Sequence, residues 1–404
     1  MREVFNYIKD NLPKTIKDTY PELKPVVSPC IKEGFTTFYY WDTYFANLAL
    51  LALGNSAQVK NNLDNMKYMV ETIGYIPNEY APDNPWGCMN RSQPPLFARG
   101  VRDYYEYTQD KGVIETYLSA IKKEYDFWQT KRLSPCGLNH YGHCATNEYL
   151  EVFYRVICER LRIDEDFYLD KMEQSQHFMA FAESGWDFTP RFWEANNPYA
   201  GMHYASVDLN SILYEVECIL SEFSVLLGRH DEAEQYAIFS EKRKALMEKY
   251  MRAEDGIYYD YNFMTEERSP ILSAASTLPY MVGLSADRKV LEGIVNRLDG
   301  KCGLSVCEKT EWECQDQWAY PSVWPPVCYF VYSALEKTGS KKAKPFAQKY
   351  MKLVEDTYAS TGRLWEKYDA EKGGVPSGLE YDAVEMLGWT AGVYLYFLGK
   401  PVIG

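Results

Sequence analysis

The chain has 404 residues, of which 46% are hydrophobic and 25% charged, an ordinary globular composition that excludes whole-chain disorder, collagen and coiled coil. Its 43 basic and 57 acidic residues give a net charge of −14. This balance argues against nucleic acid or an anionic membrane as a partner, because both require a basic surface. The 35 Tyr and 10 Trp are numerous; most would fill contacts between helices, but aromatic faces on an acidic chain also suit a carbohydrate site.

The chain shows no targeting or membrane signal in its sequence. Residues 1–24 have neither an apolar core segment nor a small-residue cleavage site, and no stretch of about 18 apolar residues occurs. The ten cysteines are scattered, which in a large chain without a leader favours free thiols over a disulfide framework. We therefore expect a cytoplasmic protein with no membrane partner.

Apolar residues recur at helical spacing along the chain, and credible strands are few. Gly or Pro stands near many of the expected helix ends. The patterns predict helices over 41–53, 59–72, 94–109, 113–130, 147–162, 164–180, 206–226, 231–252, 286–298, 321–337, 341–358 and 383–398. No Gly-, Ser- or Pro-rich linker divides them, so we predict one domain over residues 1–404, with residues 1–30 as a helical N-terminal extension.

About twelve helices in consecutive pairs predict an all-α fold of the (α/α)6 type, a toroid with six inner and six outer helices. Clusters of Trp, Asp, Glu, Arg and Gln recur in the connections between helix pairs. In a toroid these connections converge at one end of the ring. An open helical solenoid is the alternative, but it would require a repeating sequence period, and none is present.

Five segments are rich in residues that suit a sugar site. They are 38–42 (Phe-Tyr-Tyr-Trp-Asp), 76–78 with 90–95 (Ile-Pro-Asn, Asn-Arg-Ser-Gln-Pro-Pro), 183–192 (Glu-Ser-Gly-Trp-Asp-Phe-Thr-Pro-Arg-Phe), 317–326, and 365–369 with 380–389. Glycoside hydrolysis requires two carboxylates, one to protonate the leaving oxygen and one to activate water or attack the sugar. Composition does not choose the pair, but Asp187 and Glu366 each follow a Trp that could desolvate them.

The order of these motifs resembles the trehalases of glycoside hydrolase family 37 over roughly residues 34–396. The resemblance implies an (α/α)6 barrel and hydrolysis with inversion. It places the catalytic acid at Asp187, in Glu-Ser-Gly-Trp-Asp, and the catalytic base at Glu366, in Glu-Lys-Tyr-Asp. The substrate-binding candidates that follow from it are Phe35, Tyr39, Trp41, Asp42, Asn78, Arg91, Gln93, Glu148, Gly185, Trp186, Trp318 and Glu380.

The chain departs from the family where the family binds the leaving-group sugar, the aglycone. Residues 34–37 (Gly-Phe-Thr-Thr) replace an Arg-Phe-Arg-Glu stretch, and 146–148 (Thr-Asn-Glu) replace Arg-Pro-Glu. The Gly-rich run of the family is reduced to 373–379. Glu79, His140, His143 and Arg191 are candidates to replace the missing arginines.

These departures favour an inverting hydrolase of a small α-glucoside with weak or absent activity on trehalose. Distant relatives in family 63 cleave other α-glycosides on the same barrel. True trehalase is the alternative within the same class. A non-catalytic sugar-binding protein on the same barrel is the alternative of another class.

The two carboxylates also have structural interpretations. Asp187 could cap a helix before 188–190 (Phe-Thr-Pro), and Glu366 could be a surface partner of Lys367 or Arg363. Arg91 could simply pair with a structural carboxylate. The ordered set of motifs outweighs these interpretations.

Other residues invite structural or metal-binding interpretations. Trp318 and Trp324 could belong to the core, and Asp208 is more typical of a helix cap than of a sugar ligand. His140, His143 and Cys144 lack a clear fourth zinc ligand. The acids 164–166 are better explained by capping of a helix start than by metal binding. We expect no metal or cofactor, a small carbohydrate as the partner, and a monomer or homodimer.

Overall fold

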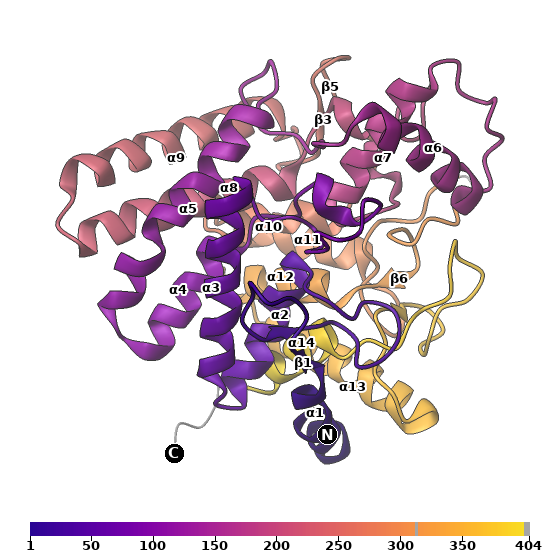
Figure 1. Ribbon diagram of the computed structural model, residues 1–404. Helices are drawn as coiled ribbons and strands as arrows, with labels where there is room; N and C mark the ends of the chain where they lie inside the picture. Colours follow the sequence, from indigo (N-terminus) through magenta and orange to yellow (C-terminus); the bar gives the residue numbers. More distant parts are fainter. Residues whose placement is uncertain (312–313, 400–404) are drawn as a thin grey trace.

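The computed structural model describes residues 1–311 and 314–399; the last residues of the predicted domain, 400–404, lie outside them. Helices dominate this part of the chain (Figure 1). They are α1 (Arg2–Asn11), α2 (Tyr40–Ala52), α3 (Ser56–Ile73), α4 (Phe97–Thr108), α5 (Lys111–Lys131), α6 (Asn147–Leu161), α7 (Lys171–Ser184), α8 (Val207–Leu226), α9 (His230–Tyr250), α10 (Leu278–Met281), α11 (Arg288–Leu298), α12 (Pro325–Lys337), α13 (Ala343–Thr361) and α14 (Gly388–Leu398).

The strands are two-residue segments that pair antiparallel beside the helix ends. β1 (Ile16–Lys17) pairs with β2 (Val26–Val27), and β6 (Ser322–Val323) pairs with β7 (Tyr368–Asp369). β4 (Tyr261–Asn262) lies between β3 (Tyr204–Ala205) and β5 (Glu267–Arg268). These ladders tie loops together rather than build a layer of their own.

Six elements close into an inner ring. Around the ring, α2 packs on α4, α4 on α8, α8 on α10, α10 on α12, α12 on α14, and α14 returns to α2. The side chains of α2, α8 and α12 are buried around most of the helix, as expected of helices with no solvent side. The labels of α2, α12 and α14 accordingly lie near the middle of the view in Figure 1.

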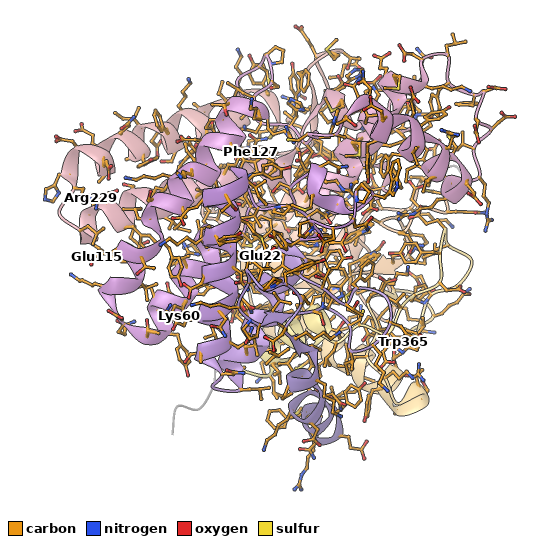
Figure 2. The ribbon with its side chains drawn as sticks, viewed as in Figure 1. Glu22, Lys60, Glu115, Phe127, Arg229 and Trp365 are labelled. Carbon is orange, nitrogen blue, oxygen red and sulfur yellow. The ribbon has the colours of Figure 1, made fainter. Side chains whose placement is uncertain are left out.

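The outer helices bury one face each against this ring. α3 packs on α2 and α4, α5 on α4 and α8, α9 on α8, α11 on α12, and α13 on α12 and α14. Lys60 on α3, Glu115 on α5 and Arg229 directly before α9 are exposed to solvent (Figure 2). The predicted (α/α)6 toroid is confirmed. None of the helices in the described residues has the length and hydropathy to cross a bilayer.

The sequence predicts that inner and outer helices alternate along the chain. The structure departs from this prediction at α6 and α7. The main contacts of α6 and α7 are with each other and, for α7, with the short 3-10 helix η4 (Gly201–His203). The pair therefore lies beside the ring, at the upper right of Figure 1. The inner position is taken instead by α10, which was not predicted because a four-residue helix has no readable period.

Two expected helix boundaries are corrected. The helix expected over 164–180 begins at Lys171, because the Asp170 side chain accepts the Glu173 amide and caps it there. Residues 164–166 form a turn before it, in which the Asp166 amide donates to the Asp164 carboxylate. The N-terminal extension is helical only in α1 and the short 3-10 helix at Leu12–Thr15; β1 and β2 follow.

A close helix contact closes the ring between α14 and α2. At Gly392 a Cβ atom would lie 1.9 Å from the carbonyl oxygen of Phe45. Trp389, one turn earlier, meets Trp41 edge to face with ring centroids 6.1 Å apart. Only glycine allows α14 to approach the α2 backbone this closely.

Candidate active site

A cavity of about 240 Å³ opens where several inner helices begin. Trp41 and Asp42 lie in the first turn of α2, Gln93 just before α4, Trp324 directly before α12, and Trp389 in the first turn of α14. Aligned helix starts carry partial positive charge, so the cavity favours electron-rich groups such as hydroxyls and carboxylates. The motif-bearing connections therefore meet at one end of the ring, as predicted.

The cavity brings together eleven of the fourteen residues singled out from the sequence. They are Phe35, Tyr39, Trp41, Asp42, Asn78, Arg91, Gln93, Gly185, Asp187, Trp318 and Glu366. Cys88, Arg160, Ala182, Trp324, Tyr381, Met386 and Trp389 also line it and were not among the candidates. Trp186, Glu380 and Glu148 do not line it.

Backbone and side-chain contacts hold the motif segments at the start of α2. The Tyr40 amide donates to the Asn78 carbonyl at 3.0 Å, and the Asn78 amide donates to the Arg91 carbonyl at 2.8 Å. The Gln93 side-chain oxygen accepts the Trp41 amide at 3.0 Å, which satisfies one of the orphan donors of that helix start. The segments around residues 41, 78 and 91 are thus fixed relative to one another.

Stacked tryptophans form one wall. Trp318 and Trp324 lie parallel with ring centroids 3.9 Å apart, and Trp186 stacks on Trp318 at 5.4 Å. All three are buried. Trp318 and Trp324 therefore belong both to the core and to the cavity lining, whereas Trp186 supports the wall from behind.

Gly185 ends α7 and turns the chain toward the cavity. It has a φ of +74°, and a Cβ atom there would lie 2.8 Å from the Trp41 ring. Both the left-handed backbone and the close ring contact require glycine. The turn places Asp187 in the cavity wall and does not use it as a helix cap; Thr189 caps the short 3-10 helix that follows.

Arg160 holds the Asp187 carboxylate. Its Nη1 lies 3.1 Å from Oδ2 of Asp187, and its Nη2 donates to the Asp187 carbonyl at 2.8 Å. The same Nη2 donates to Glu380 at 3.1 Å. This arginine could not be predicted from the sequence, because it lies near the end of an amphipathic helix, α6, outside every motif.

Glu380 lies behind Arg160 and borders a neighbouring cavity of about 310 Å³. Its Oε1 also accepts the amides of Phe188 and Gln317, each at 3.3 Å. Burial raises the pKa of Glu380 to about 7, and the nearby Arg160 opposes that rise. Glu380 thus positions Arg160 and the segment after Asp187 rather than lining the cavity.

Glu366 is buried, with an exposed fraction of 1%, beside a lysine that is fully buried. Lys367 Nζ lies 2.9 Å from Oε1, the Val384 amide donates to Oε1 at 3.3 Å, and the Tyr381 hydroxyl donates to Oε2 at 3.4 Å. Burial raises the pKa of Glu366, while the charge of Lys367 and these hydrogen bonds lower it. The Glu366–Lys367 pair suggested from the sequence exists, but inside the protein rather than at its surface.

Lys367 has little room to move. Its Nζ lies 3.7 Å from the centroid of the Tyr381 ring and donates to the side-chain oxygen of Gln317. Burial lowers its pKa, and the adjacent Glu366 opposes that change. Asp42 also lines the cavity; burial raises the pKa of Asp42 to about 7, and the nearby Glu366 carboxylate adds to that rise.

Glu148 lies apart from the cavity, in the exposed first turn of α6. Thr146 caps this helix by accepting the Tyr149 amide at 3.4 Å. The Thr-Asn-Glu segment is therefore used as a helix start, where an acidic residue in the first turn is favoured by the helix dipole.

Two structural alternatives are settled by contacts. Arg91 is buried and donates to Asn90, Tyr149 and Cys88 rather than to a structural carboxylate. The expectation that Asp208 caps a helix is wrong: Ser206 occupies the cap position of α8, and Asp208 pairs with the buried Arg191 at 2.8 Å.

The candidates to replace the missing arginines do not line the cavity. Arg191 is paired with Asp208 and Asp260 in the core, and Glu79, His140 and His143 lie outside the cavity wall. The arginines that line it are Arg91 and Arg160.

One group in the described ranges has metal-ligand spacing, namely Glu173, His177 and His203. His177 Nδ1 already accepts the Met202 amide at 3.1 Å, and His203 Nδ1 is 2.7 Å from Glu194. A neutral imidazole has one lone pair, so the Met202 contact uses that of His177. The protein's own hydrogen bonds explain this cluster.

Comparison with known proteins identifies the family. The sequence profile of the Trehalase family matches residues 6–401. The chain belongs to the trehalase family. It is 29% identical over 407 residues to the periplasmic trehalase of Pseudomonas aeruginosa, covering 94% of this chain and 72% of that protein. As a member of this family the protein is a glycoside hydrolase.

Solved structures of the same fold include two kinds of enzyme. The neutral trehalase of Saccharomyces cerevisiae matches with a TM-score of 0.76 and 20% identity, covering 97% of this chain and 79% of that one. A family 63 mannosylglycerate hydrolase from Thermus thermophilus, solved with glucose, matches with a TM-score of 0.67 and 17% identity, covering 98% and 99%. At these identities the likeness concerns the fold.

The expected cytoplasmic location is contradicted by the comparison with the curated relative. The curated relative from Pseudomonas aeruginosa is periplasmic, which points away from the cytoplasm. All ten cysteines are free thiols, as expected, but free thiols do not identify a compartment.

Proposed function

We propose that this chain hydrolyses an α-glucosidic bond with inversion, with Asp187 as the general acid and Glu366 as the general base. The observation that carries the proposal is that the two carboxylates, 179 positions apart in the sequence, line one cavity in contrasting surroundings. Asp187 is partly exposed, with its side chain 30% accessible, whereas Glu366 is buried beside Lys367. We further propose that residues 1–404 act as a single catalytic domain.

The surroundings of Glu366 fit the role of base, and the position of Asp187 fits that of acid. A base must be ionised to accept a proton from water, and the adjacent Lys367 stabilises the anionic form of Glu366. An acid must reach the leaving oxygen, and Asp187 lies on the open side of the cavity next to Arg160. Aromatic walls and polar groups such as Asn78 and Gln93 suit a sugar ring between them.

We propose an α-glucoside other than trehalose as the best substrate. Gly34 and Thr146 stand where the family carries arginines for the leaving-group sugar, so two charge-assisted donors are absent. Arg160 restores a guanidinium beside Asp187, and this observation favours trehalose as the second candidate. Measuring kcat/KM for trehalose beside kojibiose, nigerose, maltose, sucrose and glucosylglycerate decides between them.

Proton NMR of the fresh product tests inversion on sucrose or glucosylglycerate, whose leaving groups are not glucose, because an inverting enzyme releases only the β-anomer of glucose from such an α-glucoside. Release of the α-anomer from one of these substrates would refute the assigned mechanism. Asp187→Asn and Glu366→Gln should each lower turnover by at least about a hundredfold, the low end of general acid–base contributions. Glu148→Gln removes an exposed carboxylate outside the cavity and is the matched control. Near wild-type turnover in a folded Asp187 or Glu366 variant would remove that residue from the mechanism.

A further inference from the structure

A line of three stacked aromatic rings leads from the cavity wall to the surface. The Arg91 guanidinium lies over the Phe153 ring at 5.6 Å. Phe153 stacks on Tyr149 with centroids 5.7 Å apart and an interplanar angle of 26°. Tyr149 stacks on Trp86 at 6.0 Å and 29°. We refer to Trp86, Tyr149 and Phe153 as the aromatic ridge.

The outer end of the ridge is open to solvent. Trp86 is 54% exposed, although one face of its indole covers Tyr149. Tyr149 and Phe153 are partly exposed. Trp86 lies only two residues before Cys88, which lines the cavity, so the segment that carries the indole also borders the sugar site. Stacking on Tyr149 makes the exposed indole a fixed platform rather than a free side chain.

The ridge lies on the leaving-group side of the cavity. Tyr149, Phe153 and Arg160 are all on α6, at spacings of four and seven residues that place them on one face of the helix. Arg160 contacts Asp187, the proposed acid, which protonates the oxygen of the departing group. The eleven residues from Tyr149 to Arg160 correspond to about 16 Å along the helix, further than a single sugar ring extends.

We propose that the aromatic ridge binds the aglycone of the substrate, and that this aglycone is a saccharide of two or more rings. The inference rests on the proposed function. The apolar C–H face of a sugar ring packs on the electron-rich face of an aromatic side chain, and Trp offers the largest such face. The substrate is then longer than the small α-glucoside expected from the sequence, with its terminal glucose in the cavity and its remainder over α6.

The wild-type enzyme tests the length preference. Its kcat/KM is measured on α-linked glucose di-, tri- and tetrasaccharides of one linkage at a time, covering the 1,2, 1,3, 1,4 and 1,6 linkages. For the linkage that is cleaved best, we expect the trisaccharide to exceed the disaccharide by about threefold to tenfold, the strength of one or two aromatic contacts. A disaccharide that is cleaved as well as the longer saccharides would overturn the proposal.

Variants of the ridge separate binding from a structural role. Trp86→Ala should lower the ratio of trisaccharide to disaccharide kcat/KM by about threefold to tenfold, mainly through KM, and Trp86→Phe should restore most of it. Phe167→Ala is the matched control, because Phe167 is a 63% exposed aromatic that packs on its neighbour Tyr168 away from the ridge. If the indole only fixes the segment to α6, Trp86→Ala changes both substrates equally and the ratio stays constant, which refutes the proposal.

The experiments distinguish a failure of the proposed aglycone binding by the ridge from a failure of the proposed glycosidase function. If disaccharides are hydrolysed and Asp187→Asn abolishes this activity, but no length preference is seen, the ridge is refuted and the function stands. If no saccharide of the series is hydrolysed, and calorimetry finds no binding to Glu366→Gln, the proposed function is refuted together with the ridge.

Discussion

Replacing the buried Lys367 by methionine should move the acidic limb of the pH–rate profile. Lys367 Nζ lies 2.9 Å from the Glu366 carboxylate, and both side chains are buried, with exposed fractions of 0% and 1%. An opposite charge at such a distance lowers a carboxyl pKa by about 1–3 units. The substitution Lys367→Met keeps a similar volume and removes only the charge and its hydrogen bonds.

The direction of the shift follows from the role of the base. Burial already raises the pKa of Glu366, and Lys367 opposes that rise, so removing the lysine raises the pKa further. Asp42, the Cys30 thiol and the Tyr381 hydroxyl also interact with the carboxylate, and all three remain. A base works only when deprotonated, so activity that is lost below its pKa should now be lost at a pH about 1–3 units higher.

The assay is kcat/KM against pH for the wild type and Lys367→Met, with folding checked by circular dichroism. Lys352→Met is the matched control, because it removes a lysine 2.7 Å from Asp356 at an exposed site. An exposed pair of this kind contributes about 0–1 kcal/mol and should leave the profile in place. An acidic limb that moves by less than about 0.3 units in folded Lys367→Met would refute the assigned coupling to the base.

Three further substitutions test the ring and the cavity. Gly392→Ala should lower the free energy of unfolding, measured in urea, by at least about 2 kcal/mol, because the new Cβ would meet the α2 backbone at 1.9 Å. Gly293→Ala in α11 is the control and should be neutral or stabilising, because the space around Gly293 is open. Equal stabilities of the two variants would contradict the close contact. Arg160→Met should lower kcat/KM by about 10- to 100-fold through lost charge-assisted hydrogen bonds, yet leave inhibition by free glucose nearly unchanged. If kcat/KM and glucose inhibition weaken equally, Arg160 contacts the terminal glucose rather than the leaving group. Gly185→Ala should reduce turnover, since its Cβ would press on Trp41 at 2.8 Å, and wild-type turnover would show that the ring can yield.

The helices were largely predictable because each long helix carries its own period and stop signals. All twelve expected helices exist, with ends that differ by a few residues except at Lys171, where the Asp170 cap decides the start. The four-residue α10 was not predictable, since its helical form depends on the ring around it. For the same reason the sequence did not reveal that α6 and α7 lie beside the ring.

At the site, the cavity-lining residues that could be predicted from the sequence are those inside local motifs. Residues that come to the cavity from segments without a motif could not be predicted. Trp41, Asp42 and Asp187 sit in distinctive short segments, and all line the cavity. Arg160 is 27 positions before Asp187 on an ordinary amphipathic helix, so only the packing of α6 brings it there. The family resemblance makes Glu148 a substrate-binding candidate because of its motif position. In the structure Thr146 caps a helix there, and Glu148 lies exposed in the first turn of that helix.

The closure of the ring by α2 and α14 has a consequence for how the protein is made. Trp41 must meet Trp389 to finish the cavity, so the wall of the site is assembled from two segments nearly 350 positions apart in the chain. At a synthesis rate of about 5–20 residues per second, α2 leaves the ribosome roughly 20–70 s before α14 is made. During that interval α2 lacks the α14 surface against which it packs in the finished ring. Contacts of such long sequence separation form slowly. A nascent chain that has not yet reached α14 therefore leaves the apolar α2 without this partner and has no complete sugar pocket.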